Sequence, residues 1–483
     1  MSYGEEKECR ALLSCILFVW NKSAKKNHPI KGEGIMVTKS VWIDTVKSIN
    51  YPPLKKDISV DILIIGGGIT GVSCLYHLKN SKYKVALVEQ NKIGHATTGN
   101  STGKLSYLQD SLIDKIRKSA SEEKASFYLK FQRDAIEYIV NQITKESLSC
   151  DLEKVNSKVY TNQESEVELL KELKNFLERN GVLVKETTSS FVKSKYMIET
   201  EDTYVFHPLK FLQELLKKNT FPVYENTSIQ KIRKQNSTYL CYTKEHCIKA
   251  KKVILASHYP YFFIPFFFPS KASLEKSYLA ASNPQKEKTS LISYSNPYIS
   301  IRSDSKQFLY LTSTQDIEKK TSSSKQLLKL KKSLKDLKIT PTHIWSNLDV
   351  KSVDGLPYIG RLKEEIYLST GYNTWGLATG FYAGKMIKDL LENKDNIYLK
   401  LTNPNRSIKM FSKIENVIKS MKGFINGWTS IEEETRICPH MGCKLIFNRI
   451  EGIYECPCHG SKFNDEGKCI NGPSKKDIQI KSD

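Results

Sequence analysis

The strongest constraint on this chain is a doubled pattern of cysteine and histidine near its C-terminal end. The first half reads Cys438-Pro-His440, and 15 residues later the second half reads Cys456-Pro-Cys458-His459. Five of the 11 cysteines gather in this region, and cysteines with histidines between them indicate a metal site rather than a secreted disulfide framework. The ligands suit tetrahedral zinc, or a two-iron cluster in which two thiolates hold one iron and two imidazoles the other. The tight Cys-x-His and Cys-x-x-His spacing favours the two-iron cluster.

A strand–helix–strand unit is predicted toward the other end of the chain. The apolar run that starts at Val60 ends in glycines, as a buried parallel strand does, and residues 69–79 follow with a helical pattern. Residues 83–89 then form a second apolar run. The connecting loop, Gly66-Gly-Gly68-Ile-Thr-Gly71, predicts a dinucleotide site because it combines a tight turn with the N-terminus of a helix.

Three glycines and one glutamate of this unit have predicted roles in binding a dinucleotide. Gly66 permits the turn, Gly68 lets the backbone approach the pyrophosphate, and Gly71 lets the helix pack closely on the strand. Glu89 ends the second strand, where its carboxylate can accept hydrogen bonds from the adenosine ribose. The glycine loop, both strands and the acid together make the dinucleotide prediction specific.

Later segments are also expected to contact the cofactor. Segment 94–105, which includes Thr98 and Ser101, has small residues that cannot pack a core but can lie under a flat ring. Strand 252–257, with Ala256, returns to the nucleotide-binding unit. A glycine-rich turn at 371–376 opens a helix, whose N-terminal N–H groups can stabilise negative charge on a reduced cofactor ring.

The middle of the chain predicts a second domain that is interleaved with the first. Helical and strand-like patterns alternate there, over 125–143, 164–178, 187–205, 209–218 and 223–229. In the predicted strand 299–302, Arg302 could bind a substrate carboxylate through two parallel hydrogen bonds. A surface ion pair is an equally good interpretation of that arginine.

Composition argues against several classes of partner. The net charge of +22 would attract nucleic acid or an anionic membrane, but the lysines are spread through the whole chain and no arginine-rich stripe with interleaved aromatics occurs. We therefore predict a generally basic enzyme with no nucleic-acid partner. No apolar stretch is long enough to span a membrane, and none resembles a signal peptide. We expect no integral membrane segment and a cytoplasmic location.

The 483 residues are predicted to form four parts: an extension (1–35), an oxidoreductase region (36–395), a linker (396–430) and a metal-binding domain (431–483). Lys31-Gly-Glu-Gly-Ile-Met36 can be encoded by a purine-rich run of the kind that positions bacterial ribosomes before a start codon. Met36 is therefore predicted to be the natural start, and a real but disordered extension is the other interpretation.

From about Val41 onward the chain resembles the D-amino-acid-oxidase-like family of FAD-dependent oxidoreductases, in particular a bacterial subgroup with a C-terminal Rieske [2Fe-2S] domain. The resemblance implies an α/β fold: a Rossmann-like FAD-binding domain, an interleaved α+β substrate domain and a small all-β Rieske module. It implies FAD as the dinucleotide, with the backbone near Ile229 at the adenine. The residues that it places beside the flavin are Gly371, Trp375, Gly376 and Leu377.

In this family a hydride is removed from a carbon next to an amine nitrogen, which requires positioning and a neutral amine more than a dedicated base. Two departures leave the substrate open. The segment 309–314 replaces a paired-glycine turn, and the aromatic run 262–268 is unusually apolar for the presumed substrate side.

Rieske domains of the respiratory type imply roles for the C-terminal residues. Cys438 and Cys456 would hold one iron and His440 and His459 the other, while Cys443 and Cys458 would form a disulfide that braces the two loops. Ser461 matches a hydroxyl that raises the cluster potential, whereas Phe463 stands where high-potential relatives have tyrosine, so a low or middle potential is expected. Residues 471–473 resemble the third loop over the cluster. Too few residues lie between Gly427 and Cys438 for the strands that normally precede the first loop. The module is therefore expected to be truncated and to depend on the flavin domain for stability.

The leading hypothesis is an enzyme with FAD and a [2Fe-2S] cluster that oxidises a small amine or amino-acid-like substrate. Its electrons would pass through the cluster to an external electron carrier. The alternative is a redox sensor or electron-transfer partner without its own substrate. A third possibility is an enzyme in which the cluster receives electrons from a reductase and passes them to the flavin.

Overall fold

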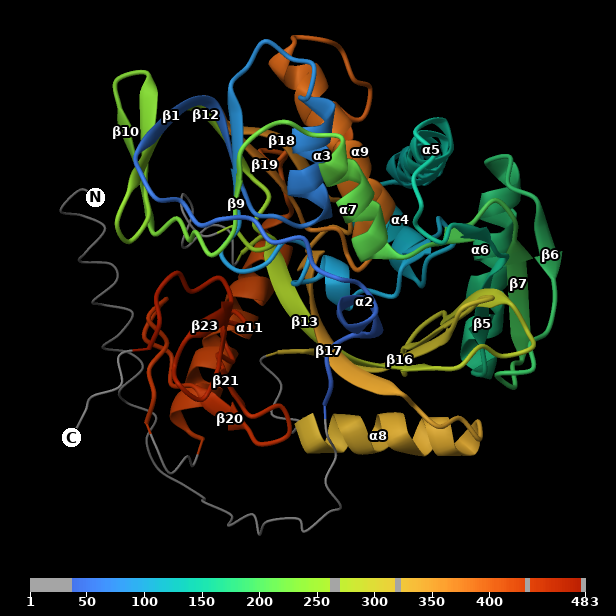
Figure 1. The fold of residues 1–483 in the computed structure, drawn as a ribbon. Coiled ribbons are helices and arrows are strands. Elements are labelled where there is room, and N and C mark those ends of the chain that lie inside the picture. The colour runs from blue at the N-terminus through green and yellow to red at the C-terminus, as the bar shows by residue number, and fades with distance from the viewer. Residues whose placement is uncertain (1–36, 261–269, 318–322, 431–434, 479–483) are drawn as a thin grey trace. The chain divides into compact units, whose positions relative to one another are not determined.

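The computed structural model describes residues 37–260, 270–317, 323–430 and 435–478. The predicted extension 1–35, the predicted start Met36 and the aromatic run 262–268 lie outside the described residues. Two eight-stranded sheets, a four-stranded sheet and a three-stranded sheet carry the fold (Figure 1). No helix among the described residues is both long and apolar enough to cross a bilayer.

The first sheet is mostly parallel and has β1 at its centre. Strand β1 pairs in parallel with β2 on one side and β12 on the other, and Ile64 lies opposite Leu87 and Ile254. Residues 62–64 are fully buried because helices or strands cover both faces, which explains the uninterrupted apolar run. The strands of this sheet are β1 (Ile58–Ile65), β2 (Val85–Val88), β9 (Val223–Tyr224), β10 (Lys231–Gln235), β11 (Thr238–Tyr242), β12 (Cys247–Leu255), β18 (Tyr358–Lys363) and β19 (Ile366–Thr370).

Two helices, α3 and α9, pack tightly against each other beside this sheet. Glycine makes their close approach possible, since a Cβ at Gly384 would lie 2.6 Å from the backbone carbon of Ser73. The main helices are α3 (Ile69–His77), α4 (Leu112–Ser119), α5 (Glu122–Lys145), α6 (Val167–Arg179), α7 (Pro208–Lys217), α8 (Ser323–Asp336) and α9 (Gly376–Leu391). Helix α2 (Val41–Asp44) is a single turn that begins at the side-chain cap of Ser40.

The second sheet runs in the order β17-β13-β16-β15-β14-β5-β7-β6 and is antiparallel except where β14 pairs with β5. Its strands are β5 (Ser157–Thr161), β6 (Val184–Glu186), β7 (Tyr196–Thr200), β13 (Ala272–Ser282), β14 (Thr289–Ser293), β15 (Ile299–Ser303), β16 (Phe308–Asp316) and β17 (His343–Ser352). Helix α8 lies along it, against β16 and β13. The chain leaves the first sheet for the second twice, which confirms the predicted interleaving. Strands β3 (Lys104–Leu105), β8 (Tyr204–Val205) and β4 (Glu153–Lys154) form the three-stranded sheet.

The C-terminal module is a small β-sheet of β20 (Ile446–Asn448), β21 (Ile453–Glu455), β22 (Lys462–Phe463) and β23 (Cys469–Asn471). The preceding segment was expected to be a linker, but it contains α10 (Leu399–Thr402) and a long helix, α11 (Met410–Trp428). Glycines bring α11 close to the module, since a Cβ at Gly423 would lie 2.4 Å from the carbonyl oxygen of Pro457. The segment is therefore structured support for the module.

A buried ion-pair network attaches the module to the second sheet. Lys276 of β13 lies 2.6 Å from carboxylate oxygens of both Glu451 and Glu455, and Lys462 lies 3.2 Å from Glu451. Tyr278 and Ser346 also donate hydrogen bonds to Glu451, at 2.7 and 2.9 Å. The side chains of Lys276 and Glu451 are only 9% and 8% exposed. The expected dependence of the module on the larger domain thus has a specific chemical basis.

The network also determines the protonation state of its members. Burial alone would raise the pKa of Glu451, but the ammonium groups of Lys462 and Lys276 outweigh burial and hold that pKa well below its usual range. Burial alone would lower the pKa of Lys276, and the carboxylates of Glu455 and Glu451 raise it instead. Glu451 and Lys276 are therefore both charged at neutral pH.

Replacing Glu451 by Gln leaves two buried ammonium groups with less compensation, which costs about 3 kcal/mol of stability. We expect Glu451→Gln to lower the guanidinium concentration at which the visible circular dichroism of the cluster is lost. The matched control is Glu201→Gln, because Glu201 pairs with Lys185 on the surface, where solvent screens the pair and its contribution to stability is small. Equal behaviour of the two variants would show that the network does not hold the module.

Candidate functional site

The first functional element is the turn between β1 and α3. Gly66 has a φ of +111°, and a Cβ there would lie 2.5 Å from the carbonyl oxygen of Ala256. A Cβ at Gly71 would lie 1.9 Å from the carbonyl oxygen of Gly66. Gly68 caps α3 without a side chain of its own, and the first N–H of the helix, that of Ile69, donates to the Thr98 hydroxyl at 3.0 Å. Gly66 and Gly71 therefore require glycine for the reasons that the sequence indicated.

Glu89 stands at the end of β2 beside this turn. Its carboxylate accepts hydrogen bonds from the backbone N–H groups of Gly67 at 2.7 Å and Asn91 at 2.8 Å. Burial raises the pKa of Glu89, while these two hydrogen bonds act in the opposite direction. The carboxylate is therefore held in a fixed position.

These elements open into one cavity of about 260 Å³. Gly71 does not line it and acts by helix–strand packing instead. The other predicted nucleotide-site residues all lie in its wall: Gly66, Gly68, Glu89, Thr98, Ser101, Ile229, Ala256, Gly371, Trp375, Gly376 and Leu377. Segments more than 300 residues apart in sequence thus converge on one site.

A second group of wall residues carries charge and comes mainly from the second sheet. Asp349 accepts a hydrogen bond from the side-chain amide of Asn347 at 3.1 Å. Burial, helped by repulsion from the Glu275 carboxylate, raises the pKa of Asp349 to about 7. Lys351 pairs with Glu275, and its ammonium group lies 5.2 Å from the centre of the Tyr298 ring. Asp349, Lys351 and Tyr298 all line the cavity.

Two further charged residues lie in the same wall. Burial raises the pKa of Asp110. Lys104 donates hydrogen bonds to the carbonyl oxygen of Leu291 at 3.1 Å and to the Ser300 hydroxyl at 2.8 Å, and burial lowers its pKa well below the usual range. The sequence analysis placed the segment that contains Lys104 beside the cofactor, but it gave no role to Asp110, Lys104, Asp349 or Lys351, because no pattern shows that these side chains meet at one wall.

The expectation for Arg302 requires correction, because this residue does not line the cavity. Its guanidinium is fully buried and pairs with Asp304 at 2.6 Å. It also donates to the carbonyl oxygens of Thr102, Gly103 and Phe206. Arg302 therefore joins segments of the chain, and no other arginine lines the described cavity to replace it as a carboxylate ligand.

The two cysteine loops of the C-terminal module have the same backbone pattern. In the first loop, the N–H of Gly442 donates to the Cys438 carbonyl and the N–H of Cys438 donates to the Cys443 carbonyl. The second loop repeats both bonds, from Gly460 to Cys456 and from Cys456 to Ser461. Gly442 and Gly460 both have φ near +70°. The doubled sequence pattern is thus a doubled loop structure.

This pattern brings the predicted ligands together. The rings of His440 and His459 have centroids 5.1 Å apart. The Cys456 thiol lies in hydrogen-bonding reach of Cys438 and lowers the pKa of Cys438, and the Ser461 hydroxyl acts in the same direction. Both ring nitrogens of His459 are buried without a hydrogen-bond partner among the described residues. Buried polar atoms of this kind fit a metal ligand.

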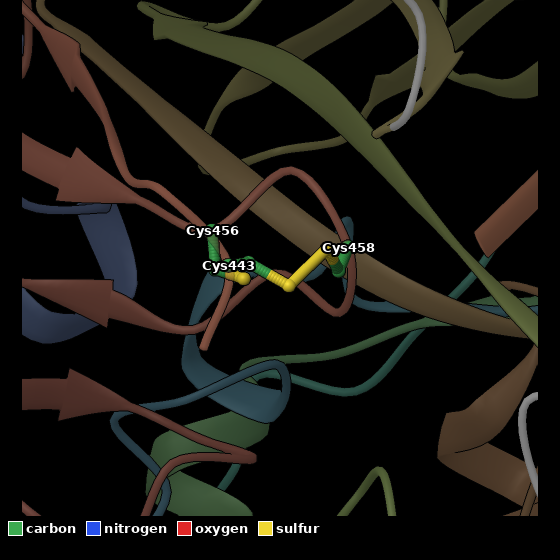
Figure 2. A group of neighbouring side chains, drawn as sticks. All are labelled: Cys443, Cys456 and Cys458. Atoms are coloured by element: carbon green, nitrogen blue, oxygen red, sulfur yellow. A yellow bond between two sulfur atoms is a disulfide. The ribbon is translucent and has the colours of Figure 1, made fainter. Parts of the chain in front are cut away.

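Cys443 and Cys458 form a disulfide, as the resemblance implied. Figure 2 shows this bond with Cys456 beside it, and ligand atoms of the three cysteines lie within 4.8 Å of one another. Sulfur atoms that are bonded to each other offer no thiolate. The thiols left to hold iron in these two loops are therefore Cys438 and Cys456.

The module also forms part of the cavity wall. Ile470, Asn471 and Gly472 of its third loop line the cavity, and the side-chain amide of Asn91 donates to the Ile470 carbonyl at 3.0 Å. Tyr259, another wall residue, has its ring centroid 5.8 Å from that of His459. The predicted cofactor cavity and the predicted metal loops therefore adjoin, which no sequence pattern indicated.

Comparison with known proteins agrees with this geometry. The family model described as FAD dependent oxidoreductase matches residues 61–390, and the Rieske [2Fe-2S] domain model matches residues 434–481. YhfW of Bacillus subtilis (strain 168), whose name describes a Rieske 2Fe-2S iron-sulfur protein, is 26% identical over 91% of this chain and 96% of its own length. Gamma-glutamylputrescine oxidoreductase of Escherichia coli (strain K12) is 23% identical over 71% of this chain and 85% of its own length.

Among solved structures, glycine oxidase from Geobacillus kaustophilus superimposes with a TM-score of 0.60 at 17% identity. The match covers 73% of this chain and 100% of that chain, and it shows a shared fold.

We predict that Gly71→Ala abolishes flavin binding, because its Cβ would collide with the Gly66 carbonyl oxygen and displace the phosphate-facing turn. Flavin content of the purified protein, read from absorbance, should fall on the order of tenfold or more. Gly181→Ala is the control, because its φ of +72° strains the backbone of an alanine outside the cavity wall while the added Cβ has no neighbour within 4 Å, so stability should fall but flavin content should not. Full flavin content in Gly71→Ala would show that the turn does not need this close approach.

Proposed function

Because this chain belongs to the family of FAD-dependent oxidoreductases and ends in a Rieske [2Fe-2S] domain, we propose that it oxidises a small amine or amino-acid-like substrate. The electrons would then pass singly through its own cluster to an external carrier. One observation carries this proposal: the module that holds the cluster ligands also forms part of the wall of the flavin-binding cavity. Intramolecular transfer between the two cofactors follows from that arrangement.

The residues divide between the two cofactors as follows. Gly66, Gly68, Gly71 and Glu89 serve the ADP half of FAD, and the turn at 371–377 serves the flavin. Cys438 and Cys456 hold one iron, and His440 and His459 hold the other. When bound, FAD accepts a hydride from the carbon beside the amine nitrogen, and the cluster carries single electrons.

The charged wall of the second sheet supports an amine as the substrate. Asp110 and Asp349 supply carboxylates to the cavity, Lys351 is neutralised by its partner Glu275, and burial lowers the pKa of Lys104 well below its usual range, which favours its uncharged form. A wall with two carboxylates and no arginine suits an ammonium group better than a lone carboxylate. The name of the gamma-glutamylputrescine oxidoreductase relative also gives an amine derivative as that protein's substrate. A sensor without a substrate would not need such a wall, so we favour an enzyme.

Tyr259 and His459 mark where the cavity and the cluster loops meet. The phenol ring of Tyr259 is 5% exposed and contacts the ring of a proposed iron ligand. The neighbouring His258 lines the cavity, and burial lowers its pKa to about 4, so it is neutral at physiological pH. Tyr259 therefore contacts both the cavity and a cluster loop.

We expect kcat/KM for an amine to rise with pH through about 7, the pKa of Asp349, because only the carboxylate form can bind and deprotonate an ammonium group. In Asp349→Asn this limb of the profile should disappear, and kcat/KM at neutral pH should fall on the order of tenfold or more. Asp202→Asn serves as the control, since Asp202 is an exposed residue. If the limb near pH 7 persists in Asp349→Asn, another group binds the amine.

His459→Ala removes one proposed iron ligand and leaves the flavin site intact. Under anaerobic reductive titration, the wild-type chain should accept two electrons at the flavin and one at the cluster. The variant should accept only those of the flavin, with loss of the cluster absorbance and of turnover with one-electron carriers. Unchanged turnover with such carriers in the variant would refute the relay.

A further inference from the structure

Helix α11 carries an exposed apolar stripe that the proposed redox function does not use. Seven of the 13 large apolar side chains that are exposed in the described part of the chain belong to this one helix, with exposed fractions from 38 to 69%. They are Met410, Ile414, Val417, Ile418, Met421, Ile425 and Trp428. At 3.6 residues per turn, these positions fall within an arc of about 100°.

The stripe is not the face that attaches α11 to the rest of the protein. That face is formed by Asn416, Gly423 and Gly427, which are buried. A Cβ at Gly427 would lie 2.6 Å from the Lys444 carbonyl oxygen, and Phe424 packs against the core of the C-terminal module. The helix is thus held in place by one face, and a second face is left apolar and exposed to solvent.

The charges on α11 and its cap indicate what could cover the stripe. Four lysines, Lys409, Lys413, Lys419 and Lys422, accompany the single acid Glu415, which pairs with Lys419 at 3.4 Å. Trp428 ends the helix, at a position typical of side chains that lie between the apolar and polar zones of a membrane.

We propose that α11 binds the surface of a membrane that contains anionic lipids, with its apolar stripe buried among the acyl chains and its lysines at the headgroups. An amphipathic helix with a narrow apolar face and a basic polar face lies in the plane of the interface. A second copy of the chain fits less well, because a paired helix needs opposite charges beside its apolar seam and this helix offers mostly lysines.

Membrane binding would also determine where the cluster delivers electrons. Gly423 of α11 packs on Pro457, which lies between Cys456 and Cys458, so the cluster loops would be held close to the lipid. A lipid-soluble electron acceptor is then the matching partner. This last step depends on the function proposed above, whereas the binding of α11 to lipid does not.

The test is vesicle flotation of the full-length holoprotein. Vesicles of phosphatidylcholine with added phosphatidylglycerol should carry the protein upward, pure phosphatidylcholine vesicles should carry much less, and high salt should weaken the association. The triple variant Ile414→Gln, Ile418→Gln and Ile425→Gln should reduce partitioning on the order of tenfold or more. Leu183→Gln, which changes an apolar side chain that is 82% exposed elsewhere, should bind as wild type does.

Flavin and cluster absorbance report whether the triple variant is folded. A second variant, Lys413→Gln with Lys422→Gln, keeps the stripe and should lose the preference for anionic vesicles. The proposal fails if the wild-type protein does not float, or if both variants float as it does. It also fails if the wild-type protein is a dimer without lipid and the triple variant is a monomer, since a second copy would then cover the stripe.

Discussion

The arrangement of this protein depends on the attachment of a very small module to a large domain. The four strands of the module have two or three residues each, and its buried core consists largely of cysteines. A sheet of this size cannot stabilise itself by apolar burial alone. The buried network of Lys276, Glu451 and Lys462 and the close contact with α11 supply the missing support, and they also fix the cluster loops beside the cavity.

That attachment gives the cavity two chemically different ends. Glycines, helix N–H groups and the fixed carboxylate of Glu89 form the nucleotide end, where Lys475 of the C-terminal module also lines the wall. The end proposed for the substrate is lined by Asp110, Asp349 and the paired Lys351. The same wall therefore combines a family-typical cofactor site with the carboxylates on which the proposed amine specificity rests, and it adjoins the cluster loops.

The sequence predicts those parts of the structure that depend on local rules. The loop from Gly66 to Gly71, strand β1 and helix α9 follow from glycine placement and apolar periodicity, and the doubled Cys/His pattern identified both metal loops. The sequence could not reveal the pairing of Lys276 with Glu451, because those residues are 175 positions apart. It could not show that Arg302 is buried and hydrogen-bonded, and it did not predict helix α11 within the linker, because the apolar residues of α11 are interrupted by lysines.

Transfer of electrons within one chain is the central claim, and its kinetics test it most directly. The flavin can be reduced by an anaerobic light pulse and the cluster followed by rapid freezing and electron paramagnetic resonance, with no other carrier present. Intramolecular transfer predicts that the cluster is reduced with a rate constant that does not change with protein concentration. A rate proportional to protein concentration, or a cluster that stays oxidised beside a reduced flavin, would contradict the account.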